Sequence, residues 1–69
     1  MNVSRFDLVA DYLGQTEIKT AAFLNNNRGN TFIIRESDIV WGENDSFGRE
    51  AMVVIRQYVC RGFIRVTWI

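Results

Sequence analysis

Apolar and polar residues alternate along the last third of the chain, in two runs that meet near a glycine. The runs are Ala51–Val59 and Phe63–Ile69, and both are rich in β-branched and aromatic residues and contain no proline. Alternation with this composition is typical of strands, and the intervening Cys60-Arg61-Gly62 is short enough for a turn. The pattern therefore predicts a C-terminal antiparallel β-hairpin.

The predicted hairpin has two unlike faces. With a two-residue turn, Tyr58 lies opposite Arg65 and Arg56 lies opposite Thr67. One face is then almost entirely apolar and packs on the core, whereas the other combines arginine with aromatic side chains. The second face is the surface that we expect to meet a partner.

The N-terminal segments predict one helix and leave a second segment open. Ser4 is a typical N-cap with Asp7 at the capping-box position, and apolar residues follow at helical spacing, which predicts a helix over residues 5–13. Residues 16–27 are compatible with a helix or a strand. Thr16 as a cap and two alanines favour the helix, with Ile18, Ala21 and Ala22 facing inward.

The middle of the chain predicts further strands. Asn30–Glu36 has strand character, Asp38–Trp41 a short strand or a continuation past a kink, and residues 42–48 a polar loop. Trp41 and Trp68 are expected in the core or half-buried. The expected fold class is α+β: one or two N-terminal helices packed on a three- to four-stranded antiparallel sheet that ends in the C-terminal β-hairpin, as a single small domain over residues 1–69.

Length and composition restrict the class of protein. A chain of 69 residues builds one small core, so its stability is marginal and homodimerisation, by sheet extension or sheet-face packing, is expected to help. The hydrophobic content of 48% excludes a disordered tail. The short apolar runs, the lack of a signal-peptide pattern and the single cysteine predict a cytoplasmic protein without a membrane partner.

The residue types also limit the chemistry. The chain contains no histidine, which excludes histidine-dependent triads and metal sites, and Cys60 is its only cysteine. Two close carboxylate pairs, in segments 36–38 and 43–45, have the character of solvated loop acids, and the second lacks the ligand spacing of a calcium loop. We therefore expect no catalytic residues, no metal site and no cofactor, and hence a protein that is not an enzyme.

Charge is unevenly spread along this neutral chain. Residues 1–48 carry four basic and seven acidic side chains, a net charge of −3, and residues 49–69 carry four basic and one acidic, a net charge of +3. This distribution predicts a positive sheet face opposite a negative helical layer.

The arginine and aromatic side chains of the predicted sheet face favour protein binding, because tyrosine and arginine are enriched at the residues that dominate protein interfaces. The expected function is a non-enzymatic protein-binding module. By analogy of size and chemistry, it is expected to act as a phage or mobile-element accessory protein that inhibits a host enzyme or defence complex by stoichiometric binding. The expected partner-binding residues are Arg56, Tyr58, Arg61, Phe63 and Arg65.

An alternative function comes from residues 8–24, where Ala10, Gly14 and Phe23 stand at a characteristic spacing. The segment resembles the helix-turn-helix of small phage and bacterial repressors of the Cro type. The resemblance implies a small DNA-binding regulator, and its expected nucleic-acid contacts are Gln15, Lys19 and Arg28. Because the N-terminal half is net acidic, nucleic acid ranks below protein as the expected partner.

Overall fold

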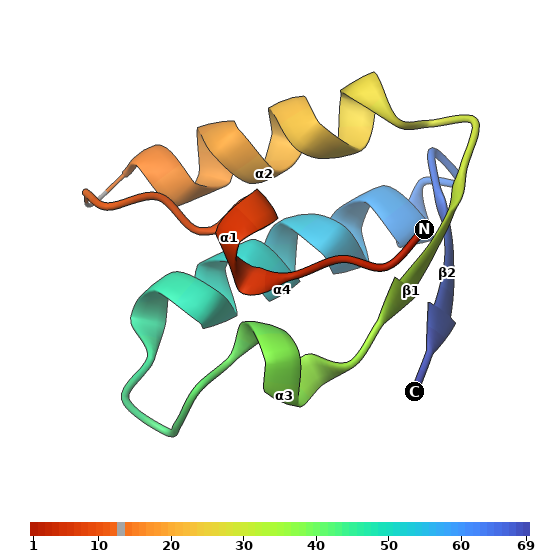
Figure 1. Ribbon diagram of the computed structural model, residues 1–69. Helices are drawn as coiled ribbons and strands as arrows, with labels where there is room; N and C mark the ends of the chain where they lie inside the picture. The colour runs from red at the N-terminus through yellow and green to blue at the C-terminus, as the bar shows by residue number, and fades with distance from the viewer. Residues whose placement is uncertain (13) are drawn as a thin grey trace.

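The computed structural model describes residues 1–12 and 14–69, and in this part of the chain helices dominate over strands (Figure 1). Leu13, the last residue of the first predicted helix, lies outside the described residues. The elements in chain order are α1 (Arg5–Leu8), α2 (Gln15–Asn26), β1 (Thr31–Ile34), α3 (Glu36–Ile39), α4 (Ser46–Cys60) and β2 (Arg65–Trp68).

The sheet overturns the predicted fold class. Among the described residues it consists of two strands, β1 and β2, which pair in parallel from Thr31 opposite Arg65 to Ile34 opposite Trp68. The class is still α+β, but the three- to four-stranded antiparallel sheet was a wrong prediction. A parallel pair needs a crossover connection, and α3 and α4 supply it.

The two edges of the sheet differ. On the outer side of β1, the Ile33 N–H donates to the Met1 carbonyl at 2.7 Å, and the Ile33 carbonyl accepts from the Val3 N–H at 3.2 Å. The N-terminal residues therefore cover β1, whereas β2 has no ladder partner other than β1 among the described residues. Homodimerisation by sheet extension accordingly stays a prediction, with the outer edge of β2 as its site.

The predicted hairpin is wrong because Ala51–Val59 belongs to helix α4. Gly48, Ala51, Met52 and Ile55 are all buried, and their spacing of i, i+3, i+4 and i+7 is that of one helix face. β-branched residues reduce helix propensity by about 0.5 kcal/mol each. Burying one large apolar side chain gains about 1.5–3 kcal/mol, so the packed face outweighs the propensity.

The glycine that suggested a hairpin turn ends this helix instead. Gly62 has φ +75°, its N–H donates to the Val59 carbonyl at 3.0 Å, and the Phe63 N–H donates to the Tyr58 carbonyl at 2.9 Å. These two bonds form a Schellman motif, which requires a left-handed residue after the C-cap. Phe63 therefore turns back onto Tyr58, and the chain continues into β2, which pairs in parallel with β1 and not with residues 51–59.

Helix α1 begins as predicted and ends early. The Asp7 carboxylate accepts from the Ser4 N–H at 3.0 Å, which confirms the role of Asp7 in the capping box. The helix stops at Leu8, not at residue 13, because Val9 is extended. Side chains of α2 satisfy the backbone groups that a longer helix would have used.

Helix α2 confirms the helical alternative for residues 16–27, but the face that it buries was not the expected one. Thr16 and Thr20 are fully buried, while Ile18, expected inside, is 63% exposed. The Thr16 hydroxyl accepts from the Ala10 N–H at 3.1 Å, and the Thr20 hydroxyl donates to the Leu8 carbonyl at 3.0 Å. A polar stripe therefore faces inward because it completes the hydrogen bonding of the preceding segment.

The segment between β1 and α4 is also less extended than predicted. Residues 36–39 form the short helix α3 where a strand was expected, and α4 begins inside the predicted polar loop. Trp41 and Trp68 are 62% and 46% exposed, so neither lies in the core, and Trp41 is more exposed than expected. Glycine and acidic residues in this segment favour helix starts as much as loops.

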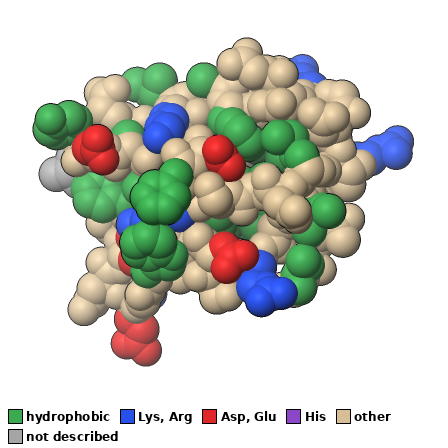
Figure 2. All heavy atoms as spheres, in the orientation of Figure 1, with side chains coloured by type: hydrophobic (Ala, Val, Ile, Leu, Met, Phe, Trp, Pro, Cys, Tyr) green, Lys and Arg blue, Asp and Glu red, His purple; other side chains and the backbone are tan. Residues whose placement is uncertain are grey.

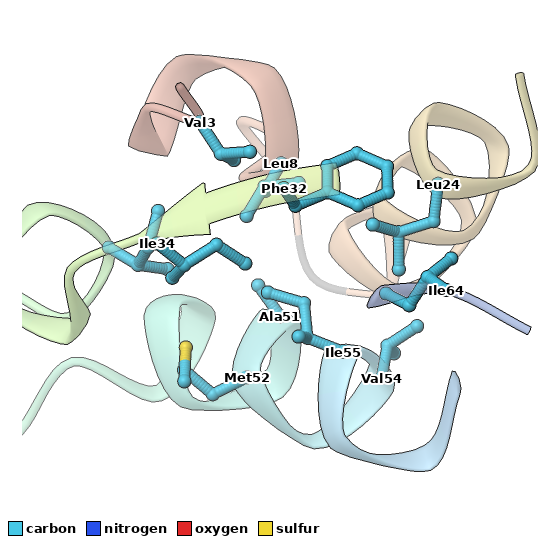
Figure 3. Packing of buried hydrophobic residues seen from close by; sticks show 11 residues of the cluster. Val3, Leu8, Leu24, Phe32, Ile34, Ala51, Met52, Val54, Ile55 and Ile64 are labelled. Atoms are coloured by element: carbon cyan, nitrogen blue, oxygen red, sulfur yellow. The ribbon is translucent and has the colours of Figure 1, made fainter. Parts of the chain in front are cut away.

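The core lies where α2, α4 and β1 meet. Figure 3 shows Phe32 and Ile34 of β1 in its middle, with Leu24 of α2 beside them and Ile55 of α4 across from them. All four side chains are fully buried. The remaining buried apolar side chains are Val3, Leu8, Ile39, Ala51, Met52, Val54 and Ile64.

Candidate functional site

A cleft of about 350 Å³ lies at the end of the sheet where β1 and β2 begin. One wall is the turn between α2 and β1, residues 28–31, and the other is the segment after the Schellman motif, residues 62–65. Arg28 stands on the first wall and Arg65 on the second, and no carboxylate lines the cleft. The site therefore presents positive charge from both sides.

An arginine–aromatic stack supports the wall of this cleft. The Tyr58 and Phe63 rings meet edge to face with centroids 5.6 Å apart, and the Arg28 guanidinium lies 4.7 Å from the Phe63 centroid. Asn25 completes the arrangement, because its Oδ1 accepts from Arg28 Nε and Nη2 at 3.0 and 2.8 Å and its Nδ2 donates to the Tyr58 hydroxyl at 2.9 Å. The end of α2 is thus fastened to the end of α4, and Arg28 is held in one orientation.

The structure separates Arg56 from the other predicted partner-binding residues. Successive residues of a helix turn by about 100°, so Arg56 and Tyr58 point to nearly opposite sides of α4. Arg56 faces α3, with its Nη2 3.8 Å from the Glu36 carboxylate, and both side chains are more than 60% exposed. Tyr58 and Phe63 meet at the cleft, which Arg65 lines, and Arg61 is the exposed C-cap residue of α4 between them.

The three residues expected to contact nucleic acid do not come together. Gln15 begins α2 and Arg28 follows its end, so about 18 Å of helix separates them. Lys19 Nζ donates to the carbonyls of Phe6 and Val9, at 2.8 and 3.1 Å, and so caps the carboxyl end of α1. Arg28 instead joins the cleft with the residues predicted to bind protein.

The sequence did not assign to the protein-binding surface either Arg28, which lines the cleft, or Asn25, which holds Arg28 in place. Their spacing of three positions near the end of a helix was the available signal, since side chains at i and i+3 are neighbours. The contact of Arg28 with Phe63 joins segments more than thirty positions apart in sequence, and no local pattern predicts it.

The predicted positive sheet face does not form, but the charges still separate in space. Residues 18–35 and 51–69 contain six basic and no acidic side chains, and all eight acidic residues lie in 7–17 and 36–50. The first two segments include the carboxyl ends of α2 and α4, the two strands and the cleft. On the face seen in Figure 2, the blue side chains at the right-hand edge stand apart from red ones, while blue and red side chains lie close together on the left and below.

The dipoles of α2 and α4 favour positive side chains at the helix carboxyl ends, but they do not neutralise the positive charge there. Each helix C-terminus carries roughly half a negative charge, which favours cations such as Arg28 and Arg61 nearby. Arg28, Arg61 and Arg65 bring three full positive charges to the ends of two helices. This end of the molecule therefore stays positive.

Another exposed feature lies at the opposite side of the core. Phe6 and Trp41 are 77% and 62% exposed and meet edge to face with centroids 6.2 Å apart, and the Arg5 guanidinium lies 4.4 Å from the Trp41 ring. Arg5 is also paired with Asp45, and that hydrogen bond holds the pKa of the Asp45 carboxyl far below its ordinary value. The shift has a structural cause, so it does not indicate catalysis.

Cys60, whose accessibility the sequence leaves open, is exposed. Residues 1–12 and 14–69 contain no cluster of three potential metal ligands and no helix long and apolar enough to cross a bilayer. Comparison of the chain with protein-family models, with curated proteins and with solved structures found no match. Function must therefore be argued from the site itself.

Proposed function

We propose that this chain is a non-enzymatic, protein-binding module that acts by stoichiometric contact. Its contact surface, here called the arginine end, consists of Arg28, Tyr58, Arg61, Phe63 and Arg65 around the cleft. The observation that carries the proposal is the gathering of arginine and aromatic side chains around one hollow, from the turn after α2, the carboxyl end of α4 and the start of β2. These residue types dominate binding energy at protein interfaces, and a fixed Arg28 loses less entropy on binding than a free one.

The groups available for catalysis support a binding role. Asp45 is the carboxylate with a clearly displaced pKa, and its oxygens are occupied by Arg5 and by the N–H groups of Trp41 and Gly48. The arginine end carries donors and aromatic surface, and the cleft walls hold no carboxylate, cysteine or lysine. Inhibition of an enzyme by occlusion requires only such a surface.

A DNA-binding regulator is the second candidate, and one observation favours it. The acid-free segments 18–35 and 51–69 together give the positive potential that a polyanion needs. Lys19, however, is hydrogen-bonded to the end of α1, and Gln15 lies at the far end of α2 from Arg28. A duplex needs a row of free cations, so this candidate ranks below protein binding.

Affinity capture with charge-matched variants tests the proposal. Tagged protein is incubated with lysate of its own host, and bound material is analysed by mass spectrometry and by nucleic-acid staining. We expect one protein at near-stoichiometric yield with the wild type and its loss with Arg28→Ala/Arg65→Ala. The control Arg35→Ala/Arg49→Ala removes the same charge from two exposed positions outside the arginine end and is expected to capture normally.

Two results contradict the proposal. One is equal capture by the Arg28→Ala/Arg65→Ala variant, which places the contact elsewhere on the molecule. The other is salt-sensitive nucleic acid in place of a protein, lost with Gln15→Ala/Lys19→Ala, which supports the DNA-binding regulator.

A further inference from the structure

The cleft of the arginine end has hydrogen-bond donors that the protein leaves unused. The Arg28 guanidinium donates through Nε and Nη2 to Asn25 Oδ1, and its Nη1 makes no hydrogen bond among the described residues. Arg65 is exposed and makes no side-chain hydrogen bond or ion pair in the same part of the chain. A guanidinium carries five N–H donors and no acceptor, so what binds here must supply acceptors.

The hydrogen-bond acceptor for these arginine donors has to come from another molecule. The lining of the cleft includes no carboxylate, and the two acid-free segments contain both of its walls. Arginine with a carboxylate or phosphate forms the strongest hydrogen bonds that a protein surface offers. The cleft is therefore complementary to an anionic group.

The aromatic residues of the site disfavour a nucleic acid as the source of that group. Binding of single strands relies on free aromatic faces on which bases stack. Phe63 is already covered by Arg28 and contacts Tyr58 edge to face, and Tyr58 is held by Asn25. A volume of about 350 Å³ also fits one side chain and its neighbours, not a run of stacked bases.

The sheet edge beside the cleft favours an extended peptide. Arg65 both lines the cleft and begins β2, whose outer edge has no ladder partner in the described ranges. An extended segment can add to such an edge through main-chain hydrogen bonds and place alternate side chains in adjoining hollows. No acidic residue of β2 or of the cleft repels an acidic segment there.

We propose that the arginine end binds an acidic, extended segment of a partner protein, which pairs with the outer edge of β2 and places a carboxylate between Arg28 and Arg65. This inference rests on the proposed function and names the chemistry of the partner. Arg28 and Arg65 both contact this carboxylate. Phe63 and Asn25 hold Arg28 in the orientation that the contact requires.

Titration with defined peptides tests the inference. The probe is a short, end-blocked peptide that alternates glutamate with threonine, and amide chemical shifts of the full chain are followed by NMR. We expect saturable shifts confined to residues 28–31 and 62–68. Arg28→Ala and Arg65→Ala are each expected to weaken binding at least about tenfold, the effect of one lost charge-assisted hydrogen bond. Arg35→Ala is the charge-matched control and is expected to leave the affinity within a factor of about two.

Other probes define the results that overturn the inference. A peptide with glutamine in place of glutamate is expected to bind at least about tenfold more weakly, and equal binding contradicts a carboxylate site. An oligothymidylate that binds the same residues more tightly than the peptide identifies nucleic acid as the ligand. Absence of saturable shifts with the acidic peptide also rejects the inference, while Arg28- and Arg65-dependent capture from lysate would leave the proposed function standing.

Discussion

At the scale of single residues, the ion pair of Arg5 with Asp45 joins more of the molecule than any other side-chain contact described. Arg5 comes from α1 and donates to the Ile39 carbonyl at the end of α3 at 2.6 Å. Asp45 is the N-cap of α4, and its carboxylate also accepts from the N–H groups of Trp41 and Gly48, at 2.8 and 3.0 Å. Two side chains thus fix the mutual position of three helices.

Asp45→Asn is expected to lower the free energy of unfolding by about 3 kcal/mol, because it leaves the half-buried Arg5 charge without its counter-ion. The Arg5 hydrogen bond holds the pKa of Asp45 below its ordinary value near 3.8 in the folded state. The stabilisation that the Asp45 carboxylate gives the fold is therefore complete at pH values above its ordinary pKa. This stabilisation is lost as the pH falls toward the pKa of Asp45 in the folded state. Urea unfolding at a series of pH values checks this. The wild type should lose stability below about pH 4 more steeply than Asp45→Asn, and parallel pH curves would show that the pair does not matter.

A substitution at Gly48 tests the close packing around this pair. A Cβ added there would lie 2.6 Å from the Ile39 carbonyl oxygen and 2.6 Å from Asp45 Oδ2. Alanine is the better helix former by about 1 kcal/mol, but a backbone oxygen cannot move aside cheaply. We expect Gly48→Ala to destabilise the fold by about 2 kcal/mol in urea unfolding. The control is Gly29→Ala, at a position where an added Cβ would meet open space. A similar loss of stability in this control would show that the close contact at Gly48 is not the cause.

At the scale of elements, helix α4 is decided by its two ends together with its buried face. Asp45 caps the amino end, and the Schellman motif at Gly62 closes the carboxyl end. The motif also aims Phe63 at Tyr58 and so builds one wall of the cleft. The end of the helix and the candidate site are one structural feature.

Gly62→Ala is expected to destabilise the chain by about 1–2 kcal/mol, because a residue with a Cβ is strained at φ +75°. It should also speed amide exchange in the last turn of α4. Thermal unfolding and hydrogen exchange measure both effects, with Cys60→Ala as a control at an exposed position of the same turn. Unchanged exchange in that turn would argue against the motif as the end of the helix.

At the scale of the whole molecule, packing turns a scattered charge pattern into two ends of opposite sign. Helices α2 and α4 lie side by side and run toward the same side of the molecule in Figure 1. Their carboxyl ends and the two acid-free segments therefore gather around the cleft. A molecule with this charge separation is oriented as it approaches an acidic partner, which raises the association rate more than the affinity.

The sequence predicted much of the candidate site and placed it on the wrong scaffold. Tyr58, Arg61, Phe63 and Arg65 were selected for their residue type and for their place on or beside one face of the predicted hairpin. Arg56 was grouped with them because residues two apart share a face in a strand, whereas they point to nearly opposite sides in a helix. Arg28 could not be grouped with them, since its contact with Phe63 depends on how α2 packs against α4.

Local sequence was enough to predict the helix start at Ser4, the strand character of residues 31–34, the uneven charge along the chain and the residue types of the arginine end. Each of these depends on neighbours along the chain. Packing between distant segments selected the helix over residues 51–59, the parallel pairing of β1 with β2, and the inward orientation of Thr16 and Thr20. The apolar run 51–59 satisfies strand and helix periodicity alike, so burial against α2 and β1 selected between them. The buried threonines are stable only because the backbone of residues 8–10 supplies their hydrogen-bond partners.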